Sequence, residues 1–109
     1  MKYMLLIHTP EDGESSPEMY AEYGAFAEEV AKAGKMLGGE ELADASTATL
    51  VRVRNGERLV TDGPFAEARE QLGGYFLVEA NDHDEAVALA AKIPGARTGT
   101  IEVRALHEH

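Results

Sequence analysis

The residues best suited to chemistry in this sequence are a histidine and an aspartate, each at the expected end of a strand. His8 closes an apolar run near the N-terminus, and histidine is the side chain that most readily transfers protons near neutral pH. Asp62 precedes Gly63-Pro64, where a strand must end because proline has a fixed φ and no N–H to donate. The pair predicts acid–base chemistry, with His8 as general base and Asp62 orienting it. The alternative is that His8 lines a polar rim and Asp62 accepts only the N–H groups of its turn.

Two aromatic side chains and a carboxylate near Asp62 are candidates for contact with a ligand. Phe65 and Tyr75 would supply apolar walls for a small ring, and a buried tyrosine hydroxyl needs a hydrogen-bond partner. Glu70 follows Arg69 in a charged stretch between the turn and the next strand. The alternatives are that both rings belong to the core and that the charged stretch is a solvated surface.

The four histidines do not predict a metal site. His83 lies among carboxylates, but Asp82 and Glu85 have the spacing of a helix capping box, which explains their presence. His107 and His109 lie at the end of the sequence. The sequence contains no cysteine, which excludes thiolate nucleophiles, disulfides and sulfur-ligated metals. We therefore expect neither a metal nor a cofactor.

Length and charge narrow the class of protein further. The 109 residues suffice for one core, so we expect a single domain over residues 1–109. No apolar run reaches the roughly 18 residues of a membrane-spanning helix, and the N-terminus does not resemble a signal peptide. Ten Lys and Arg against twenty Asp and Glu leave a net charge of −10, which would repel a phosphate backbone. We expect a soluble cytoplasmic protein that binds neither membranes nor nucleic acid directly.

Periodicity and turn signals predict strands and two helices. Ser16 and Pro17 are typical of a helix start, and Gly34 of a helix end in the left-handed region. Asn55-Gly56 predicts a type I′ hairpin turn. Strands are expected at 2–8, 36–43 (interrupted at the double glycine by a bulge or a close backbone approach), 47–54, 57–61, 75–80 and 100–106, and helices at 17–33 and from 82 to the proline at 94.

This order of elements predicts an α+β fold, a ferredoxin-like split βαβ repeat with an inserted β-hairpin. Both helices should cover one face of the sheet. The other face would carry Met4, Leu6, His8, Tyr75 and Leu77 with no element of the chain to cover it. An apolar face of that size is seldom left in water, so we expect a homodimer.

The sequence resembles the YCII-related family in its DGPF-domain branch. The resemblance rests on the stretch from Asp62 to Phe65 followed by 66–67, on Glu70, on 72–80, and on the terminal blocks 1–6 and 99–104. It implies a ferredoxin-like subunit whose sheet packs against that of a partner to form a dimeric α+β barrel. DGPF domains also occur with alternative sigma factors, which implies a possible regulatory partner.

The activity of this family is largely unassigned. Some YCII-related members are proposed to use a histidine of the first helix, with a nearby acid, for acid–base chemistry on small cyclic substrates. The matching position here, eleven residues before Gly34, is Tyr23, so that dyad does not transfer. Tyr23 instead becomes a candidate pocket residue, and the histidine available for catalysis is His8.

Two functions follow from these expectations. The first is a cofactor-independent enzyme of the lyase or isomerase type acting on a small cyclic substrate, with His8, Asp62 and Tyr75 in the site. The second is a non-catalytic dimeric module that binds a small ligand or a regulatory protein such as an alternative sigma factor. A pocket that brings His8 and Asp62 together would favour the enzyme.

Overall fold

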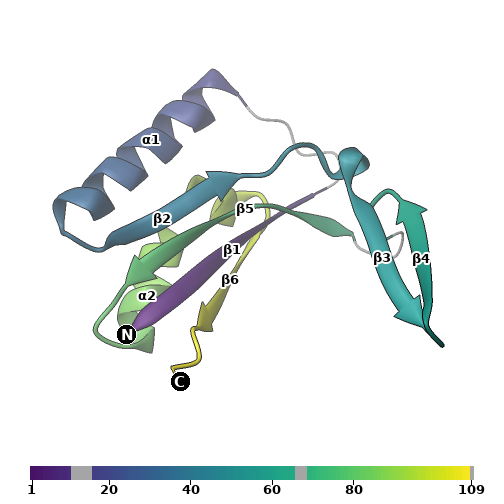
Figure 1. The fold of residues 1–109 in the computed structure, drawn as a ribbon. Coiled ribbons are helices and arrows are strands. Elements are labelled where there is room, and N and C mark those ends of the chain that lie inside the picture. The colour runs from purple at the N-terminus through teal and green to yellow at the C-terminus, as the bar shows by residue number, and fades with distance from the viewer. Residues whose placement is uncertain (11–15, 66–68, 109) are drawn as a thin grey trace.

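The computed structural model describes residues 1–10, 16–65 and 69–108, which form an α+β fold with antiparallel sheets (Figure 1). Four strands build the main sheet in the order β2-β5-β1-β6, and a separate hairpin pairs β3 with β4. This order, with the hairpin inserted between β2 and β5, is consistent with the predicted ferredoxin-like arrangement. The strands are β1 (Lys2–Pro10), β2 (Met36–Glu41), β3 (Thr49–Arg54), β4 (Glu57–Asp62), β5 (Glu70–Glu79) and β6 (Thr100–Ala105).

Both long helices begin where local chemistry predicts, and the first also ends there, whereas the second ends at Ala91, before the predicted stop at Pro94. In α1 (Pro17–Lys32), the Ser16 hydroxyl accepts from the Met19 N–H at 3.1 Å, and Gly34 follows the helix at φ +74°. In α2 (His83–Ala91), Asp82 accepts from the Glu85 N–H at 2.8 Å.

A capping box also predicts that the Glu85 side chain accepts from the backbone N–H of Asp82, and this part of the prediction is wrong. The Glu85 carboxylate accepts from the backbone N–H of Asn81 at 3.3 Å, one residue before the cap, and also pairs with Lys35. The hydrogen bond to Lys35 holds the pKa of Glu85 below its ordinary value. A cation from a distant segment therefore redirects a side chain that the local pattern assigned to the helix start.

The core lies between the two helices and one face of the main sheet. Alternation along β1 turns Tyr3, Leu5 and Ile7 into this core, where each is buried. Phe26 and Val30 cover them from α1. The remaining buried hydrophobic residues come from β5 and the residue after it, from α2 and from the turn that follows α2: Val78, Ala80, Ala86, Ala90 and Ile93.

The opposite face of the sheet has no helix over it, as predicted. The register pairs Met4 with Leu77 and Leu6 with Tyr75, and these four side chains share that face. We call these four residues and Leu72 the open face. Leu72 is included because it pairs with His8, beyond the register shift that follows Ile7. All but Leu72 are half-buried in the isolated chain, and no described element covers them. The dimer that would cover this face stays a prediction.

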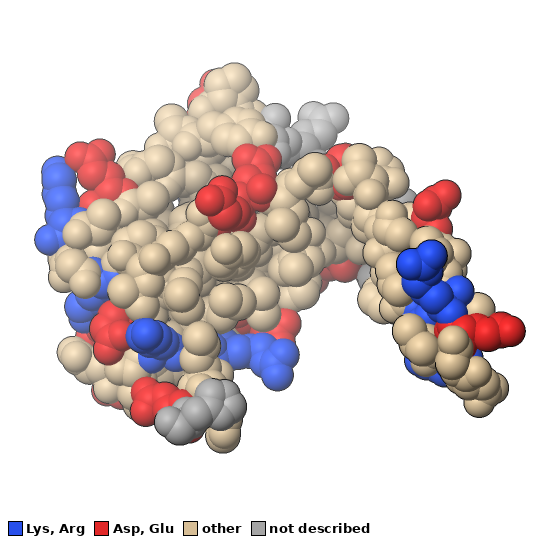
Figure 2. Space-filling view, in the orientation of Figure 1, with Lys and Arg blue, Asp and Glu red and all other residues tan. Residues whose placement is uncertain are grey.

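The inserted hairpin has the predicted register, with Arg54 opposite Glu57 and Val51 opposite Val60. Asn55 and Gly56 have φ of 54° and 78°, as a type I′ turn requires. The hairpin projects away from the main sheet as an arm (Figures 1 and 2). Its first strand begins at Thr49, two residues later than predicted, because Asp44 caps a short 3₁₀ turn over Ala45–Thr47.

Strand β5 begins at Glu70, five residues before its predicted start at Tyr75. Residues 70–74 are strand because β1 continues to Pro10 and pairs with them, Pro10 opposite Glu70 and His8 opposite Leu72. A bulge between Ile7 and His8 accommodates this extension. The expected irregularity in β2 is confirmed, since its register against β5 shifts between Met36 and Gly38.

Candidate functional site

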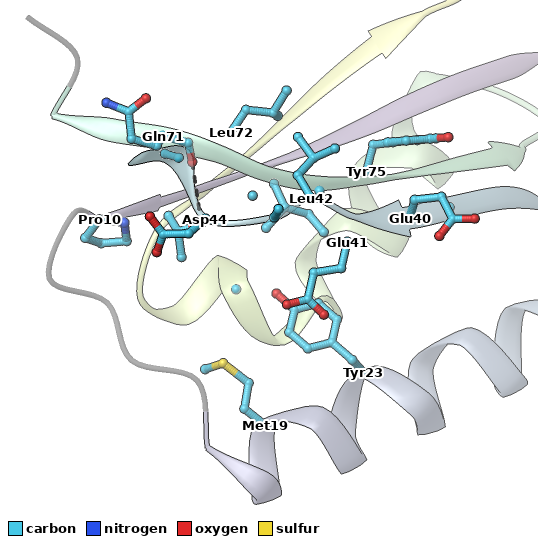
Figure 3. Close-up of a pocket in the computed structure, with 18 of the residues that line it drawn as sticks. Pro10, Met19, Tyr23, Glu40, Glu41, Leu42, Asp44, Gln71, Leu72 and Tyr75 are labelled. Atoms are coloured by element: carbon cyan, nitrogen blue, oxygen red, sulfur yellow. Dashed lines mark hydrogen bonds between the residues drawn. The ribbon is translucent and has the colours of Figure 1, made fainter. Parts of the chain in front are cut away.

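A cleft lies between the first half of α1 and the adjoining ends of β1, β2 and β5 (Figure 3). Its volume is about 860 Å³, within the range of small-molecule sites. It is on the helix-covered side of the sheet, where Ile7 and Phe76 form part of its apolar lining. The lining also includes Met19, Tyr20 and Tyr23 of α1, Glu40 and Glu41 of β2, the loop residues Leu42–Ser46, and Gly95 of the 3₁₀ turn Pro94–Arg97.

Tyr23 is the most constrained polar side chain of this cleft. Its ring stacks beside Phe76 with centroids 6.4 Å apart and an interplanar angle of 28°. Burial raises the pKa of the Tyr23 phenol, and the negative charge of Glu41 adds to this rise. A hydrogen bond from the Gly95 N–H and the positive charge of Arg97 act in the opposite direction. The phenol therefore stays protonated at neutral pH, and its oxygen is held by a backbone donor.

The charged residues of the cleft's described lining are all acidic. Glu41 accepts from the Tyr20 hydroxyl at 3.1 Å, and Figure 3 shows its carboxylate directed toward Tyr23. Hydrogen bonds from Ser46 lower the pKa of Asp44, which keeps that carboxylate ionised. With Glu40, three carboxylate residues line the cleft, and none of its described lining residues is Lys, Arg or His.

His8 lies on the other side of the sheet, on the same face as Leu6 and Leu72. Its Nε2 is 3.0 Å from Oε1 of Glu102, which stands opposite Leu6 in the register of β6 against β1. His8 is not part of the cleft lining. The carboxylate partner of His8 is therefore Glu102 of β6 and not the predicted Asp62.

Asp62 is the last residue of β4, exposed and paired in register with Thr49. No contact described for residues 1–10, 16–65 and 69–108 joins it to His8, because β4 belongs to the separate hairpin sheet whereas His8 belongs to the main sheet. The adjoining Gly63 has φ +93° and donates its N–H to the Ala48 carbonyl at 2.7 Å, which closes the base of the hairpin.

The other predicted site residues are dispersed. Tyr75 borders the cleft, but its ring points away from Tyr23 in Figure 3, in keeping with its register opposite Leu6. Phe65 is 54% exposed and lines a smaller hollow of about 370 Å³ under the base of the hairpin. Glu70 accepts from the Thr100 hydroxyl at 2.8 Å, so it ties β5 to β6. Of the predicted pocket residues, Tyr23 alone presents its polar group to the larger cleft.

Sequence reasoning missed Tyr20, Glu41, Gly95 and Glu102. Tyr20 could have been found, since it lies three residues before Tyr23 and therefore on a neighbouring part of the same helix surface. The others depend on which strands and turns become neighbours, and no local pattern signals that. In the described part of the chain, no three His, Asp or Glu side chains gather closely enough to hold a metal. Neither described helix is long and apolar enough to cross a membrane.

The fold and this cleft define a small α+β protein with a ligand-sized site under its first helix. The chain belongs to the YCII-related domain family, which it matches over residues 1–109. The predicted resemblance is thereby confirmed for the family, and the DGPF branch stays a prediction. It is similar to an uncharacterized protein, R00369, of Rhizobium meliloti (strain 1021), with 35% identity over 95 residues. That alignment covers 85% of this chain and 77% of the relative.

Proposed function

We propose that this chain is a homodimeric small-molecule-binding protein whose ligand occupies the cleft under α1. The observation that carries the proposal is the Tyr23 phenol. Its oxygen accepts from the Gly95 N–H and its pKa is raised by burial, so its proton is available to a ligand acceptor. The signature from Asp62 to Phe65 further supports placing the chain in the DGPF branch of the family.

The lining of the cleft supports a particular class of ligand. Carboxylates at Glu41 and Asp44, with no cationic side chain among the described lining, would repel an anion entering the cleft. The apolar surface of Ile7 and Phe76 suits a ring or a short hydrocarbon. We therefore propose a neutral or cationic ring compound with a hydrogen-bond acceptor for Tyr23.

Three matched ring compounds test this proposal: cyclohexanone as a neutral acceptor, benzylamine as a cation and benzoate as an anion. Ligand-observed NMR should detect binding of cyclohexanone and benzylamine but not of benzoate. The Tyr23→Phe variant should bind cyclohexanone roughly threefold to tenfold more weakly, the size expected for one net hydrogen bond. Binding of benzoate alone, or unchanged cyclohexanone affinity in Tyr23→Phe, would contradict the proposal.

A second candidate is acid–base catalysis on the open face, and the pairing of His8 with Glu102 favours it. A histidine oriented by a carboxylate is a common general base, and a dimeric barrel would enclose it. In this candidate Glu102 takes the orienting role that the sequence suggested for Asp62. The expected reaction is of the lyase or isomerase type and needs no cofactor.

Exchange of the α-hydrogens of cyclohexanone in D₂O tests the catalytic candidate without knowledge of the natural substrate. The unaltered protein should accelerate exchange, and His8→Gln should lower the rate by roughly 100-fold or more, the usual contribution of a general base. Tyr23→Phe is the matched control, because Tyr23 lies on the other side of the sheet. Equal rates for the unaltered protein and His8→Gln would eliminate this candidate.

A further inference from the structure

The two parts of α1 differ in how they are held. Residues 17–22 include no buried residue, and among them only Met19 is half-buried. Beyond this stretch, Phe26 and Val30 are buried in the core. The first part of the helix forms one wall of the cleft, into which Met19 points in Figure 3. Packing therefore fixes the second part of α1, whereas the first part borders the cleft with little apolar support.

Gly24 lies where these two parts meet, and it is the one glycine of α1. A glycine inside a helix weakens the helix relative to alanine, by a factor of roughly two to five in the local equilibrium. A close neighbour can explain a helical glycine, but a Cβ added at Gly24 would meet nothing within 4 Å, and the residue is exposed. Its effect is therefore conformational, since α1 bends or unwinds most easily at this point.

Two polar contacts tie residues 17–22 to β2 and to the 3₁₀ turn, and both are exposed. The Tyr20 hydroxyl donates to Glu41 at 3.1 Å, and Tyr20 is 52% exposed. Glu22 pairs with Arg97, and both of these side chains are also exposed. Exposed contacts of this kind are individually weak because water competes for both partners. They can therefore break and form again without disturbing the core.

Tyr23 lies next to Gly24 and is held by other contacts. Its ring stacks beside Phe76, and its hydroxyl accepts from the Gly95 N–H. A movement confined to residues 17–22 would leave both contacts in place. It would open the cleft beside the Tyr23 phenol, the group that we propose binds the ligand.

We propose that residues 17–22 are a lid that opens at Gly24 to admit the ligand and then closes over it. This inference rests on the proposed function, because it concerns access to the same cleft. The structure corresponds to the closed form, in which Tyr20 reaches Glu41 and Glu22 reaches Arg97. Opening releases these two contacts and keeps Phe26 in the core.

Fluorine NMR of protein labelled with 3-fluorotyrosine tests the motion directly. The sequence contains four tyrosines, so Tyr→Phe variants can assign every signal. Relaxation dispersion should show microsecond-to-millisecond exchange for Tyr20 but not for Tyr3, which is buried in the core. Saturating cyclohexanone should suppress the exchange of Tyr20, since the lid closes over the bound compound.

Gly24→Ala is the decisive variant. Alanine favours the continuous helix, so the fraction of open lid should fall roughly twofold to fivefold. Entry and exit of the ligand both require opening. The association and dissociation rates of cyclohexanone should therefore fall by the same factor, while its dissociation constant stays within about twofold.

Ala31→Gly is the matched control for this variant. It places a glycine at an exposed position in the part of α1 that Phe26 and Val30 anchor. It weakens the helix to a similar extent, but it should leave the exchange of Tyr20 unchanged. Faster exchange of Tyr20 in Ala31→Gly would overturn the assignment of the hinge to Gly24.

The remaining outcomes separate the lid from the proposed function. If neither cyclohexanone nor benzylamine binds, the proposed function fails and the lid fails with it. If cyclohexanone binds but Tyr20 shows no exchange, or an exchange that Gly24→Ala leaves unchanged, the lid alone is overturned. A dimer dissociation constant altered by Gly24→Ala, with Tyr20 exchange unaltered, would also overturn the lid, because Gly24 would then serve an interface.

Discussion

Replacing Gly95 by alanine tests whether the 3₁₀ turn positions Tyr23 in the cleft. Gly95 is buried, and a Cβ added there would lie 2.6 Å from the Tyr23 hydroxyl oxygen and 3.2 Å from Cγ2 of Ile7. The shorter contact is too close to persist. The hydroxyl must therefore move away, and in moving it loses the hydrogen bond from the Gly95 N–H.

The expected cost follows from two separate effects. Overpacking a buried position costs about 1–3 kcal/mol, so Gly95→Ala should lower the free energy of unfolding by that amount. Tyr23→Phe should cost about 0.5–1.5 kcal/mol for the lost hydrogen bond. In the double variant the clashing hydroxyl is absent and the bond is already lost. The double variant should thus cost less than the sum of the single variants by about 1 kcal/mol.

Urea unfolding followed by circular dichroism measures these free energies, at one fixed protein concentration because dimerisation would add to stability. Gly24→Ala is the control, since Gly24 is exposed in α1 and a Cβ there meets nothing within 4 Å. It should stabilise the protein by about 0.5–1 kcal/mol and should not couple to Tyr23→Phe. Additivity of Gly95→Ala and Tyr23→Phe within about 0.5 kcal/mol would refute the proposed contact.

Three further outcomes are expected. Because the pKa of Tyr23 is raised in the folded state, the stability that its protonated phenol contributes is intact below the ordinary pKa of 10.0 and is lost as pH rises through the higher folded pKa. Tyr23→Phe should therefore lose less stability than the unaltered protein between about pH 9 and 11. Urea unfolding at about one pH unit on either side of pH 10 measures this difference. Leu77→Glu should dissociate or unfold the dimer because it would bury an unpaired carboxylate, and a sedimentation coefficient unchanged from the unaltered protein would argue against the open face as interface. Gly34→Ala should cost about 1 kcal/mol in thermal or urea unfolding, since alanine is strained at φ +74°, and no loss would contradict this.

Features that depend only on residues close together in the sequence could be predicted. The cap at Ser16 needs only its hydroxyl and the adjoining helix, and the left-handed Gly34 needs only the absence of a side chain. The register of the hairpin follows from Asn55-Gly56, because a two-residue turn leaves one way to pair the flanking strands. The open face was also predictable, because strand alternation and the order of elements determine which residues lack a covering helix.

Features that depend on distant strands could not be predicted. His8 and Glu102 are 94 positions apart, and their contact exists because β6 lies beside β1 in one particular register. The early start of β5 at Glu70 has the same origin, since it requires β1 to continue past His8. The cleft likewise forms where α1, β2 and the turn at Gly95 meet, so the partnership of Tyr23 with that turn has no local signature.

The bulge in β2 has a consequence for how two copies can meet. β2 is an outer strand of the main sheet, and its outward backbone groups would otherwise be a template for a strand from another molecule. The shift between Met36 and Gly38 breaks the even spacing of those groups, and exposed carboxylates at Glu40 and Glu41 add repulsion between identical edges. This edge is therefore poorly suited to lengthening the sheet from molecule to molecule, which disfavours open-ended fibres built through β2.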